Sequence, residues 1–395
     1  MKRIFISDLH VGDGSAKDDF EFDEELIELL NNFSVQTDVE LVIVGDGLEL
    51  LESRVIKDFG LAPFQVLVTS LDGKALSEIE KRHPKLFESF RQFSKRHRIV
   101  YVVGNHDYYL LANEQLKNET QSIMGCEVVP YYYDENAGIL AMHGNQFDLI
   151  NKFSKDSDGN LIPPLGEYMV RYMMFYFDEY LESFVPKEIL ADYDNVRPSL
   201  DVFHWFERVL EVYDLSVDIL ELWIAAFLKM MRTAEARTWL KKNFPYLRCF
   251  SKLFLNKWGG ITIGSLLVRG VMKARNLRRS DYLFKRARKL FKERTLSSDD
   301  LTGYLDEKVY LPKLNVVVFG HIHHHSFRII HVNGQNKFYI NCGTWRPVVE
   351  KVNGKKKYGF QKKAELFYAV VTDSKDGDLE ITTNVKNKTS KSKFL

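Results

Sequence analysis

The sequence predicts an α/β protein whose core is interrupted by a long, mostly helical insertion. Short apolar runs rich in β-branched residues recur along the chain, and such runs are typical of buried strands. Stretches with helical spacing of apolar residues separate them, and this alternation predicts a layered core with helices outside. The third observation is chemical, because Asp, Asn or His follows directly after five predicted strands. These strands cover residues 2–7, 40–44, 99–103, 138–142 and 316–319.

The first predicted strand ends in Asp8-Leu9-His10, with a carboxylate and an imidazole two residues apart. Side chains alternate along an extended segment, so the two groups lie on the same side. An amphipathic helix is predicted over residues 20–32, and the second strand then ends in Gly45-Asp46. Further helices are predicted before the next strand, and one begins near Pro84, a residue favoured in the first turn.

The remaining predicted strands end in the same manner, with the sequences GNHD at residues 104–107 and HG at 143–144. After residues 316–319, Gly320 allows a sharp turn, and His321 and His323 emerge on one side of an extended segment. Two imidazoles at the end of a buried strand are a metal-ligand arrangement. Structural needs explain glycine and an occasional aspartate at strand ends. They do not explain Asp, Asn and His at all five.

Residues 151–310 form a segment between the fourth and fifth of these strands that is far longer than a loop requires. Because it starts and ends beside strand-end residues, we expect it to stand over them as a cap. The core then comprises residues 1–150 and 311–385. Predicted helices in the cap cover residues 167–184, 198–212, 217–231, 233–242 and 277–294.

Beyond the last histidines, residues 327–332, 337–341, 366–372 and 379–383 read as strands. The lysine-rich tail, residues 386–395, is predicted to be disordered.

Basic residues crowd residues 241–294 of the insertion, although the net charge of the whole chain is only +1. This run is open to two interpretations. It is either a solvated helical face or a surface for phosphate groups of a nucleic acid, a nucleotide or an anionic membrane. Interleaved apolar residues between positions 250 and 263 fit an amphipathic, lipid-facing patch, and they equally fit a helical hairpin packed on the core.

The composition is that of a folded globular protein, with 45% hydrophobic and 28% charged residues. Three widely spaced cysteines indicate a reducing compartment and no disulfide framework. The chain opens with a strand, which predicts no signal peptide, and no apolar stretch approaches the ~20 residues that span a bilayer. We therefore expect a cytoplasmic protein, with peripheral contact to the inner face of the membrane as one option.

The order of the strand-end blocks, DxH, GD, GNHD, HG and GHxH, resembles the calcineurin-like metallophosphoesterase family. The resemblance covers about residues 1–151 and 313–373. It implies an αββα sandwich of two sheets and hydrolysis of a phosphodiester or phosphoanhydride bond by a hydroxide that bridges two divalent metal ions. The substrate would be a small phosphate-containing molecule, nucleotide-linked or lipid-linked.

The resemblance also implies roles for individual residues. Asp46 would bridge two metals, with Asp8, His10 and His323 on one side and Asn105, His143 and His321 on the other. His106 would donate a proton to the leaving oxygen or stabilise the transition state, oriented by Asp107. Mixed nitrogen and oxygen ligands favour manganese, and also fit iron or zinc.

Several neighbouring residues have open roles. Asp13, His324, His325 and Arg346 are candidates to face the substrate, and both histidines fit an exposed loop equally well. Asp148 is either a cap-facing residue near the ligands or a loop cap.

Within the family, the GDGLEL block at residues 45–50 lacks the arginine of the protein serine/threonine phosphatases, which argues against that subgroup. The closest resemblance is to the UDP-2,3-diacylglucosamine pyrophosphohydrolase branch, through SDLHxG, GDxxE, HGxxFD and CGTW. The chain departs from that branch at Asn145, at His106 and in the length of its insertion.

Two alternatives remain from other classes of function. One is a DNA or RNA nuclease like the double-strand-break repair exonucleases, with the basic run tracking a sugar-phosphate backbone. The other is a non-catalytic scaffold that binds partners through its insertion. The scaffold is disfavoured because every expected ligand position carries a suitable residue.

Overall fold

The computed structural model describes the chain except for residues 157, 199–200, 215–217, 244–281, 354–357, 375–377 and 394–395. Most of the basic run and all of its interleaved apolar residues lie outside the described part. No described helix is long and apolar enough to cross a membrane.

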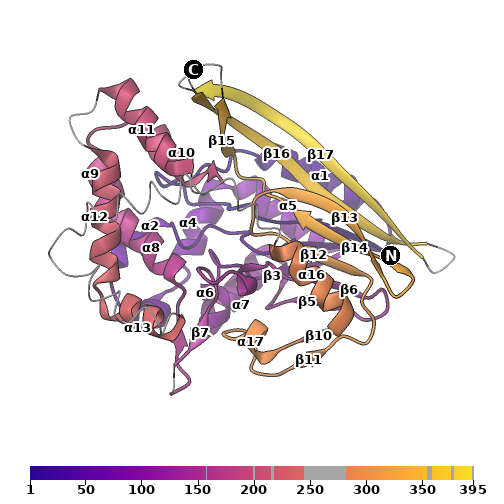
Figure 1. Ribbon diagram of the computed structural model, residues 1–395. Coiled ribbons are helices and arrows are strands. Elements are labelled where there is room, and N and C mark those ends of the chain that lie inside the picture. Colours follow the sequence, from indigo (N-terminus) through magenta and orange to yellow (C-terminus); the bar gives the residue numbers. More distant parts are fainter. Residues whose placement is uncertain are drawn as a thin grey trace.

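Two sheets form the core, and together they confirm the predicted α/β sandwich (Figure 1). In the larger sheet β1, β2, β3 and β4 are parallel neighbours, while β16 pairs with β1 antiparallel and continues the sheet to β15 and β9. Its strands are β1 (Lys2–Ile6), β2 (Val39–Val44), β3 (Arg98–Val102), β4 (Glu127–Val129), β9 (Val196–Arg197), β15 (Val348–Asn353), β16 (Tyr358–Asp373) and β17 (Leu379–Lys393).

The second sheet has the order β13-β14-β12-β6-β5, with β12 parallel to both β14 and β6. Its strands are β5 (Tyr132–Asp134), β6 (Ile139–Ala141), β12 (Val316–Phe319), β13 (His325–Val332) and β14 (Gln335–Cys342). Val42 and Val100 of the first sheet share a buried cluster with Ile139, Val316 and Ile340 of the second. This apolar seam holds the two sheets face to face.

Helices cover both outer faces of the sandwich, which completes the four layers. Apolar faces of α1 and α5 pack on the first sheet, in one cluster with Leu41 and Ile99. On the other side, Leu283 and Leu290 of α16 pack against Leu140 of the second sheet. The helices of the core are α1 (Asp23–Ser34), α2 (Arg54–Phe59), α3 (Phe64–Ser70), α4 (Lys74–Arg82), α5 (Pro84–Ser94), α6 (Tyr109–Ala112) and α7 (Glu114–Met124).

Local sequence explains where several of these helices begin and end. Asn113 precedes α7 and accepts a hydrogen bond from the Leu116 amide at 3.0 Å. The same helix ends at Gly125, whose φ of 66° lies in the left-handed region that glycine adopts without cost. Pro84 opens α5, where a missing N–H group has no consequence.

Most helices of the insertion form a bundle on one side of the sandwich, at the left of Figure 1. Helices α8 to α12 contribute to a buried cluster that includes Phe177, Trp205 and Ile224. The bundle comprises α8 (Leu165–Met173), the π-helix η2 (Met174–Asp178), α9 (Glu179–Leu181), α10 (Lys187–Asp194), α11 (Val202–Tyr213), α12 (Ile219–Met231) and α13 (Ala234–Asn243), and α16 (Tyr282–Glu293) lies apart from it. Each predicted helix of the insertion has a counterpart here.

The insertion is joined to the core along several elements. Its strand β9 pairs in parallel with β15 of the larger sheet, and α16 forms the outer layer over the second sheet. The remaining short elements are η1 (Asn145–Phe147), β7 (Ser154–Lys155), β8 (Leu161–Ile162), β10 (Thr295–Leu296), α17 (Ser298–Leu301) and β11 (Val309–Tyr310).

The prediction that residues 386–395 are disordered is wrong for most of that segment. Strand β17 runs to Lys393 and pairs antiparallel with β16 along almost its whole length. Lys386 forms an ion pair with Glu28 at 3.0 Å, and Lys388 forms one with Glu25. The polar composition reflects an edge strand that faces solvent, where backbone hydrogen bonds supply the order that apolar side chains do not.

Candidate metal centre

The carboxyl ends of β1, β2, β3, β6 and β12 meet at one edge of the sandwich. Asp8, Asp46 and Asn105 come from the larger sheet, and the three candidate histidines 143, 321 and 323 come from the smaller one. Backbone hydrogen bonds tie the loops together: the Asp8 amide donates to Gly45 at 3.0 Å, and the Gly320 amide donates to His143 at 2.9 Å. The strand-end side chains thus converge, as the sequence predicts.

Five of these residues adopt backbone conformations that side chains rarely take. Their φ angles are positive: 51° at Asp8, 53° at His10, 50° at Asp46, 70° at His321 and 53° at His323. Each such residue costs on the order of 1 kcal/mol, and residues of this kind cluster at functional sites. The strain is concentrated on the side chains that face one another at the sheet edge.

Glycines let the loops approach closely. A Cβ atom on Gly45 would lie 2.4 Å from Nδ1 of His143, and one on Gly104 would lie 2.1 Å from Oδ1 of Asp46. Neither neighbour could move without losing its place at the sheet edge. The glycines before Asp46 and Asn105 are therefore required for packing.

Carboxylates and imidazoles lie close enough together to bind the same metal ion. Oδ2 of Asp46 lies 3.0 Å from Nε2 of His143 and 3.8 Å from Nε2 of His10. Oδ1 of Asp8 lies 3.2 Å from Nε2 of His323. Within 4.8 Å, three groups could each hold a metal ion: Asp8-His10-His323, Asp8-Asp46-His143 and His10-Glu49-His106.

The hydrogen bonds of the imidazoles identify which nitrogen carries a lone pair. Nδ1 of His143 donates to the Val44 carbonyl at 2.9 Å, and Nδ1 of His10 donates to Glu49 at 2.6 Å. Nε2 of His10 and Oδ1 of Asn105 are buried and have no hydrogen-bond partner among the described residues, and Nε2 of His143 is buried against the carboxylate of Asp46. Buried polar atoms are seldom left so, and metal ligands orient their imidazoles in this way. The residues therefore fit bound metal ions.

His321 lies beside Asp148, whose role the sequence left open. Nε2 of His321 lies 3.0 Å from Oδ2 of Asp148, and its ring centroid lies 5.2 Å from that of His143. An imidazole that donates from Nε2 keeps its lone pair on Nδ1. Asp148 thus holds His321 by Nε2 and leaves Nδ1 as its lone-pair nitrogen, whereas Val44 holds His143 by Nδ1 and leaves Nε2.

The partner of the His106 imidazole is Glu49. Nδ1 of His106 lies 2.9 Å from Oε1 of Glu49, whose other oxygen accepts the bond from His10. Burial by itself lowers the pKa of His106, but the carboxylates of Glu49 and Asp46 raise it to about 10. His106 is therefore held in its protonated form, with Nε2 free of this bond.

The prediction that Asp107 orients His106 is wrong. Its oxygens accept hydrogen bonds from the amides of Gly47 at 2.9 Å and Gly104 at 2.6 Å, and from the Tyr101 hydroxyl at 2.6 Å. Burial and the neighbouring Asp46 raise the pKa of Asp107 to about 7. Asp107 instead braces the two loops that carry Asp46 and Asn105.

Glu49 is a candidate site residue that the sequence did not reveal. It closes the GDxxE block, in which only Asp46 has a predicted role. The signal was its position three residues after Asp46, but its contact with His106 depends on how two loops pack.

The other candidates have structural partners. Nε of Arg346 lies 2.9 Å from Asp19, and its Nη1 lies 3.3 Å from Glu52 and 3.9 Å from Glu49. His325 lies 3.2 Å from Glu365, whereas His324 is exposed. The carboxylate of Asp13 accepts hydrogen bonds from the Ser15 and Arg54 amides.

Comparison with known families agrees with this geometry. The sequence model described as calcineurin-like phosphoesterase matches residues 1–219. The match includes the strand ends from Asp8 to His143 and stops before His321 and His323. No curated protein matches the sequence.

Proposed function

The chain belongs to the calcineurin-like phosphoesterase family, and from this premise we propose that it cleaves a phosphodiester or phosphoanhydride bond with two bound metal ions. Family membership makes it a metal-dependent hydrolase that acts on phosphoester bonds. The observation that carries the proposal is the set of buried ligand atoms near the carboxylate of Asp46, namely the unpaired Nε2 of His10 and Oδ1 of Asn105 and the Nε2 of His143.

We assign two ligand sets to the site. Asp8, His10, Asp46 and His323 would hold one ion, and Asp46, Asn105 and His143 would hold the other. The family resemblance adds His321 to the second set. Asp46 supports the bridging role because its Oδ2 faces imidazoles from both sets. A carboxylate bridge also offsets the repulsion between two cations. Mixed nitrogen and oxygen ligands favour manganese, with iron or zinc as options.

The bound ions would lower the pKa of water and neutralise charge on the phosphoryl oxygens. The chain supplies the proton. His106 is protonated because Glu49 and Asp46 raise its pKa, and Glu49 fixes its Nδ1 at 2.9 Å. Nε2 is thus the atom that would pass a proton to the leaving oxygen. Glu49 is a positioning residue for His106.

We propose that the insertion, residues 151–310, acts as a cap that sets substrate choice over a core that supplies hydrolysis. A nucleotide-linked or lipid-linked substrate suits this division, as the resemblance to the diacylglucosamine branch suggests. Contact with a membrane surface is part of that proposal only through residues 244–281, which lie outside the described part.

The first experiment is manganese-dependent hydrolysis of bis(p-nitrophenyl) phosphate and p-nitrophenyl phosphate, with wild type beside Asp46→Asn. The proposal expects faster cleavage of the diester and loss of activity in the variant. Equal activity of the two proteins, with equal metal content, would overturn the dimetal assignment.

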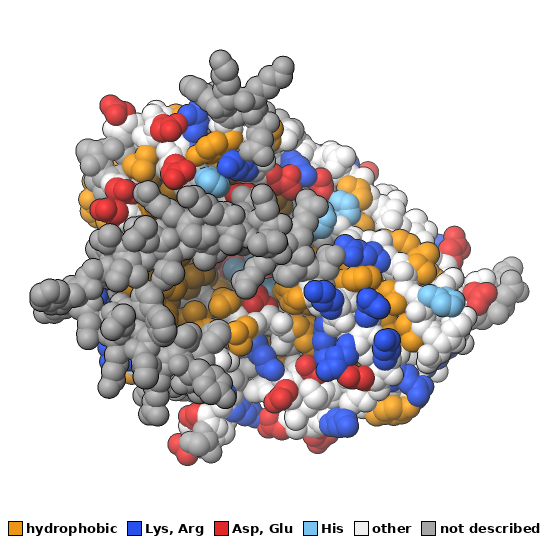
Figure 2. Space-filling view, in the orientation of Figure 1, with side chains coloured by type: hydrophobic (Ala, Val, Ile, Leu, Met, Phe, Trp, Pro, Cys, Tyr) orange, Lys and Arg blue, Asp and Glu red, His pale blue; other side chains and the backbone are white. Residues whose placement is uncertain are grey.

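One observation favours a polynucleotide substrate as a second candidate. Helix α16 begins beside the site, since Leu283 would lie 3.1 Å from a Cβ atom on Gly144. Lys and Arg side chains gather on the face where α16 lies (Figure 2). Lys285, Arg288 and Lys292 are exposed and have no ion-pair partner among the described residues.

A nuclease would use this face to follow a sugar-phosphate backbone, and its binding would weaken steeply with salt. The test is binding of single-stranded and double-stranded DNA between low and physiological salt, with Lys285→Gln/Arg288→Gln as the variant. Binding that neither salt nor the variant changes would exclude this candidate.

A further inference from the structure

Arg197 of the insertion lies directly against a candidate metal ligand. Its Nη2 atom lies 3.1 Å from Nδ1 of His323. It stands at the end of β9, more than a hundred residues before His323 in the chain. Within the described part of the insertion, this is the hydrogen bond that reaches an imidazole of the metal centre.

The segment that carries Arg197 is firmly attached to the core. Strand β9 pairs with β15, where Arg197 stands opposite Glu350, and the Val349 amide donates to the Asn195 carbonyl at 2.9 Å. Lys17 of the core reaches across to the insertion, with Nζ 3.2 Å from Asp178 and a further ion pair to Asp194.

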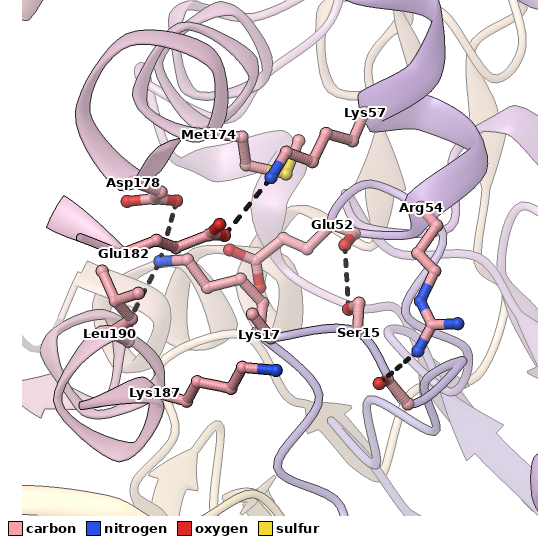
Figure 3. A pocket seen from close by; sticks show the side chains of 12 residues that line it. Ser15, Lys17, Glu52, Arg54, Lys57, Met174, Asp178, Glu182, Lys187 and Leu190 are labelled. Atoms are coloured by element: carbon pink, nitrogen blue, oxygen red, sulfur yellow. Dashed lines mark hydrogen bonds and ion pairs between the residues drawn. The ribbon is translucent and has the colours of Figure 1, made fainter. Parts of the chain in front are cut away.

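Figure 3 shows Lys17 pointing to Asp178 and Leu190 at one wall of a pocket of about 300 Å³ between core and insertion. These contacts fix the backbone just before Arg197. Its guanidinium is therefore delivered to the site by a docked segment.

Two arginines near the centre differ in their charge partners. Arg346 is paired with the carboxylates of Asp19 and Glu52. Arg197 has no carboxylate partner among the described residues, and its Nη1 donates only to the carbonyls of Asp194 at 2.6 Å and Val196 at 3.1 Å. The carboxylates of Asp194, Asp8 and Asp19 attract this half-buried cation without forming an ion pair with it, and a bound anion would supply a direct partner.

The N–H groups of Arg197 that remain unused are the ones that an anion could accept from. A guanidinium has five N–H groups. Nη1 uses two of them on the carbonyls and Nη2 uses one on His323. The Nε–H and the second Nη2–H remain without a partner among the described residues. Neighbouring N–H groups of a guanidinium can bind two oxygens of a phosphate.

Metal ligation by His323 would release the Nη2–H group of Arg197 that now donates to the imidazole. A neutral imidazole that binds metal through Nε2 carries its proton on Nδ1, and one that binds through Nδ1 has used that lone pair. In either case Nδ1 cannot accept from Arg197. The guanidinium then lies beside the metal-bound imidazole with Nη2 in need of another acceptor.

We propose that Arg197 binds the phosphoryl oxygens of the substrate, so that the insertion supplies a substrate-binding residue to the metal centre. This inference rests on the proposed function, because it takes His323 as a metal ligand. Arg197 would contribute two parallel hydrogen bonds to non-bridging oxygens. The substrate class is a phosphate ester or anhydride whose scissile phosphate bears free oxygens.

The test is calorimetric binding of inorganic phosphate to the manganese-loaded full-length protein, beside measured metal content. We expect Arg197→Gln to weaken phosphate binding about 10-fold to 100-fold at unchanged metal content, as for loss of charged hydrogen bonds. Arg197→Lys keeps the charge without the fork and should fall between. Arg197→Lys also replaces Arg197→Gln as the test variant if the glutamine variant fails to fold.

Arg54→Gln is the matched control. Arg54 also stands at the junction of core and insertion, is exposed, and donates to the Gly14 carbonyl. It should bind phosphate as wild type does.

Equal phosphate affinity in wild type and Arg197→Gln, or no phosphate binding by wild type, would overturn the inference. Loss of metal from Arg197→Gln would also overturn it, since Arg197 would then act by positioning His323. Phosphate binding that depends on Arg197 in a protein that hydrolyses no phosphoester would instead refute the proposed function.

Discussion

The sheet edge and the insertion are built in opposite ways. At the edge, Asp8 and Asp46 sit in strained loops one residue or two beyond buried strands, and neighbouring glycines make room for them. Most helices of the insertion are held by an apolar cluster, and the short segment of residues 194–197 brings Arg197 to His323. The difference supports the proposal that chemistry and substrate choice reside in separate parts of the molecule.

The largest effect should follow from a change at the sheet edge. Asp46→Asn removes a charge that faces both His10 and His143. We expect at least about a 1000-fold loss of turnover, since ligand orientation alone is worth 10- to 100-fold in such sites. Metal analysis of the purified variant, alongside diester hydrolysis, checks this. Retained activity would place the chemistry elsewhere.

Replacing His106 separates proton donation from metal binding. His106→Asn should lower turnover about 100-fold to 1000-fold, the usual contribution of a general acid, while metal content stays unchanged. The imidazole bonds to Glu49 and is not among the proposed ligands. A variant that lost its metal ions would contradict the assigned role.

The attachment of the insertion can be broken at Lys17. This buried ammonium pairs with Asp178 and Asp194, so Lys17→Met leaves two buried carboxylates without their cation. We expect the free energy of unfolding to fall by about 3 kcal/mol at pH 8. Thermal unfolding of variant and wild type measures it.

The Lys17→Met defect should depend on pH. Burial raises the pKa of Asp178 and of Asp194 to about 6, although Lys17 lowers both. Without Lys17 the two pKa values lie above 6, so the carboxylates of the variant become neutral at a higher pH than those of wild type. The stability difference from wild type should therefore shrink as the pH falls from 8 to 6 and be smallest below pH 6. A defect that is constant from pH 5 to pH 8 would argue against this ion cluster.

Glu49 offers a smaller and more diagnostic effect. Glu49→Gln should lower activity about 10-fold and lower the pKa of His106, because Glu49 is one of the carboxylates that raise it to about 10. A general acid must be protonated, so the alkaline limb of the pH–rate profile should move to lower pH. A limb at the same pH in both proteins would remove Glu49 from the role.

The smallest effect is expected at the surface where the core meets the insertion. Lys57 and Glu182 form an ion pair at 3.4 Å, and each side chain is 38% exposed. Lys57→Gln should change the free energy of unfolding by less than about 0.5 kcal/mol and leave hydrolysis intact. A large loss of stability or of hydrolysis in Lys57→Gln would contradict the proposed division of roles between core and insertion.

Sequence reasoning was strongest where structure is local. The strand before Asp8 and the glycine before Asp46 are readable over a few residues, and the structure brings these two side chains together with His143. The prediction of an extended segment at His321 and His323 is wrong, because both residues have positive φ angles. Sequence reasoning also failed at the tail, where the order of β17 comes from pairing with β16 and not from its own polar side chains.

The sequence by itself determined the α/β class, the family and the strand ends that carry the candidate ligands, because periodicity and turn chemistry act between near neighbours. Only the tertiary structure decided that Glu49 holds His106, that Asp107 braces two loops, and that Arg197 reaches His323. Those partners are tens to more than a hundred residues apart, and no local pattern encodes which loop packs against which. Their contacts arise from the burial of two sheets and a docked insertion.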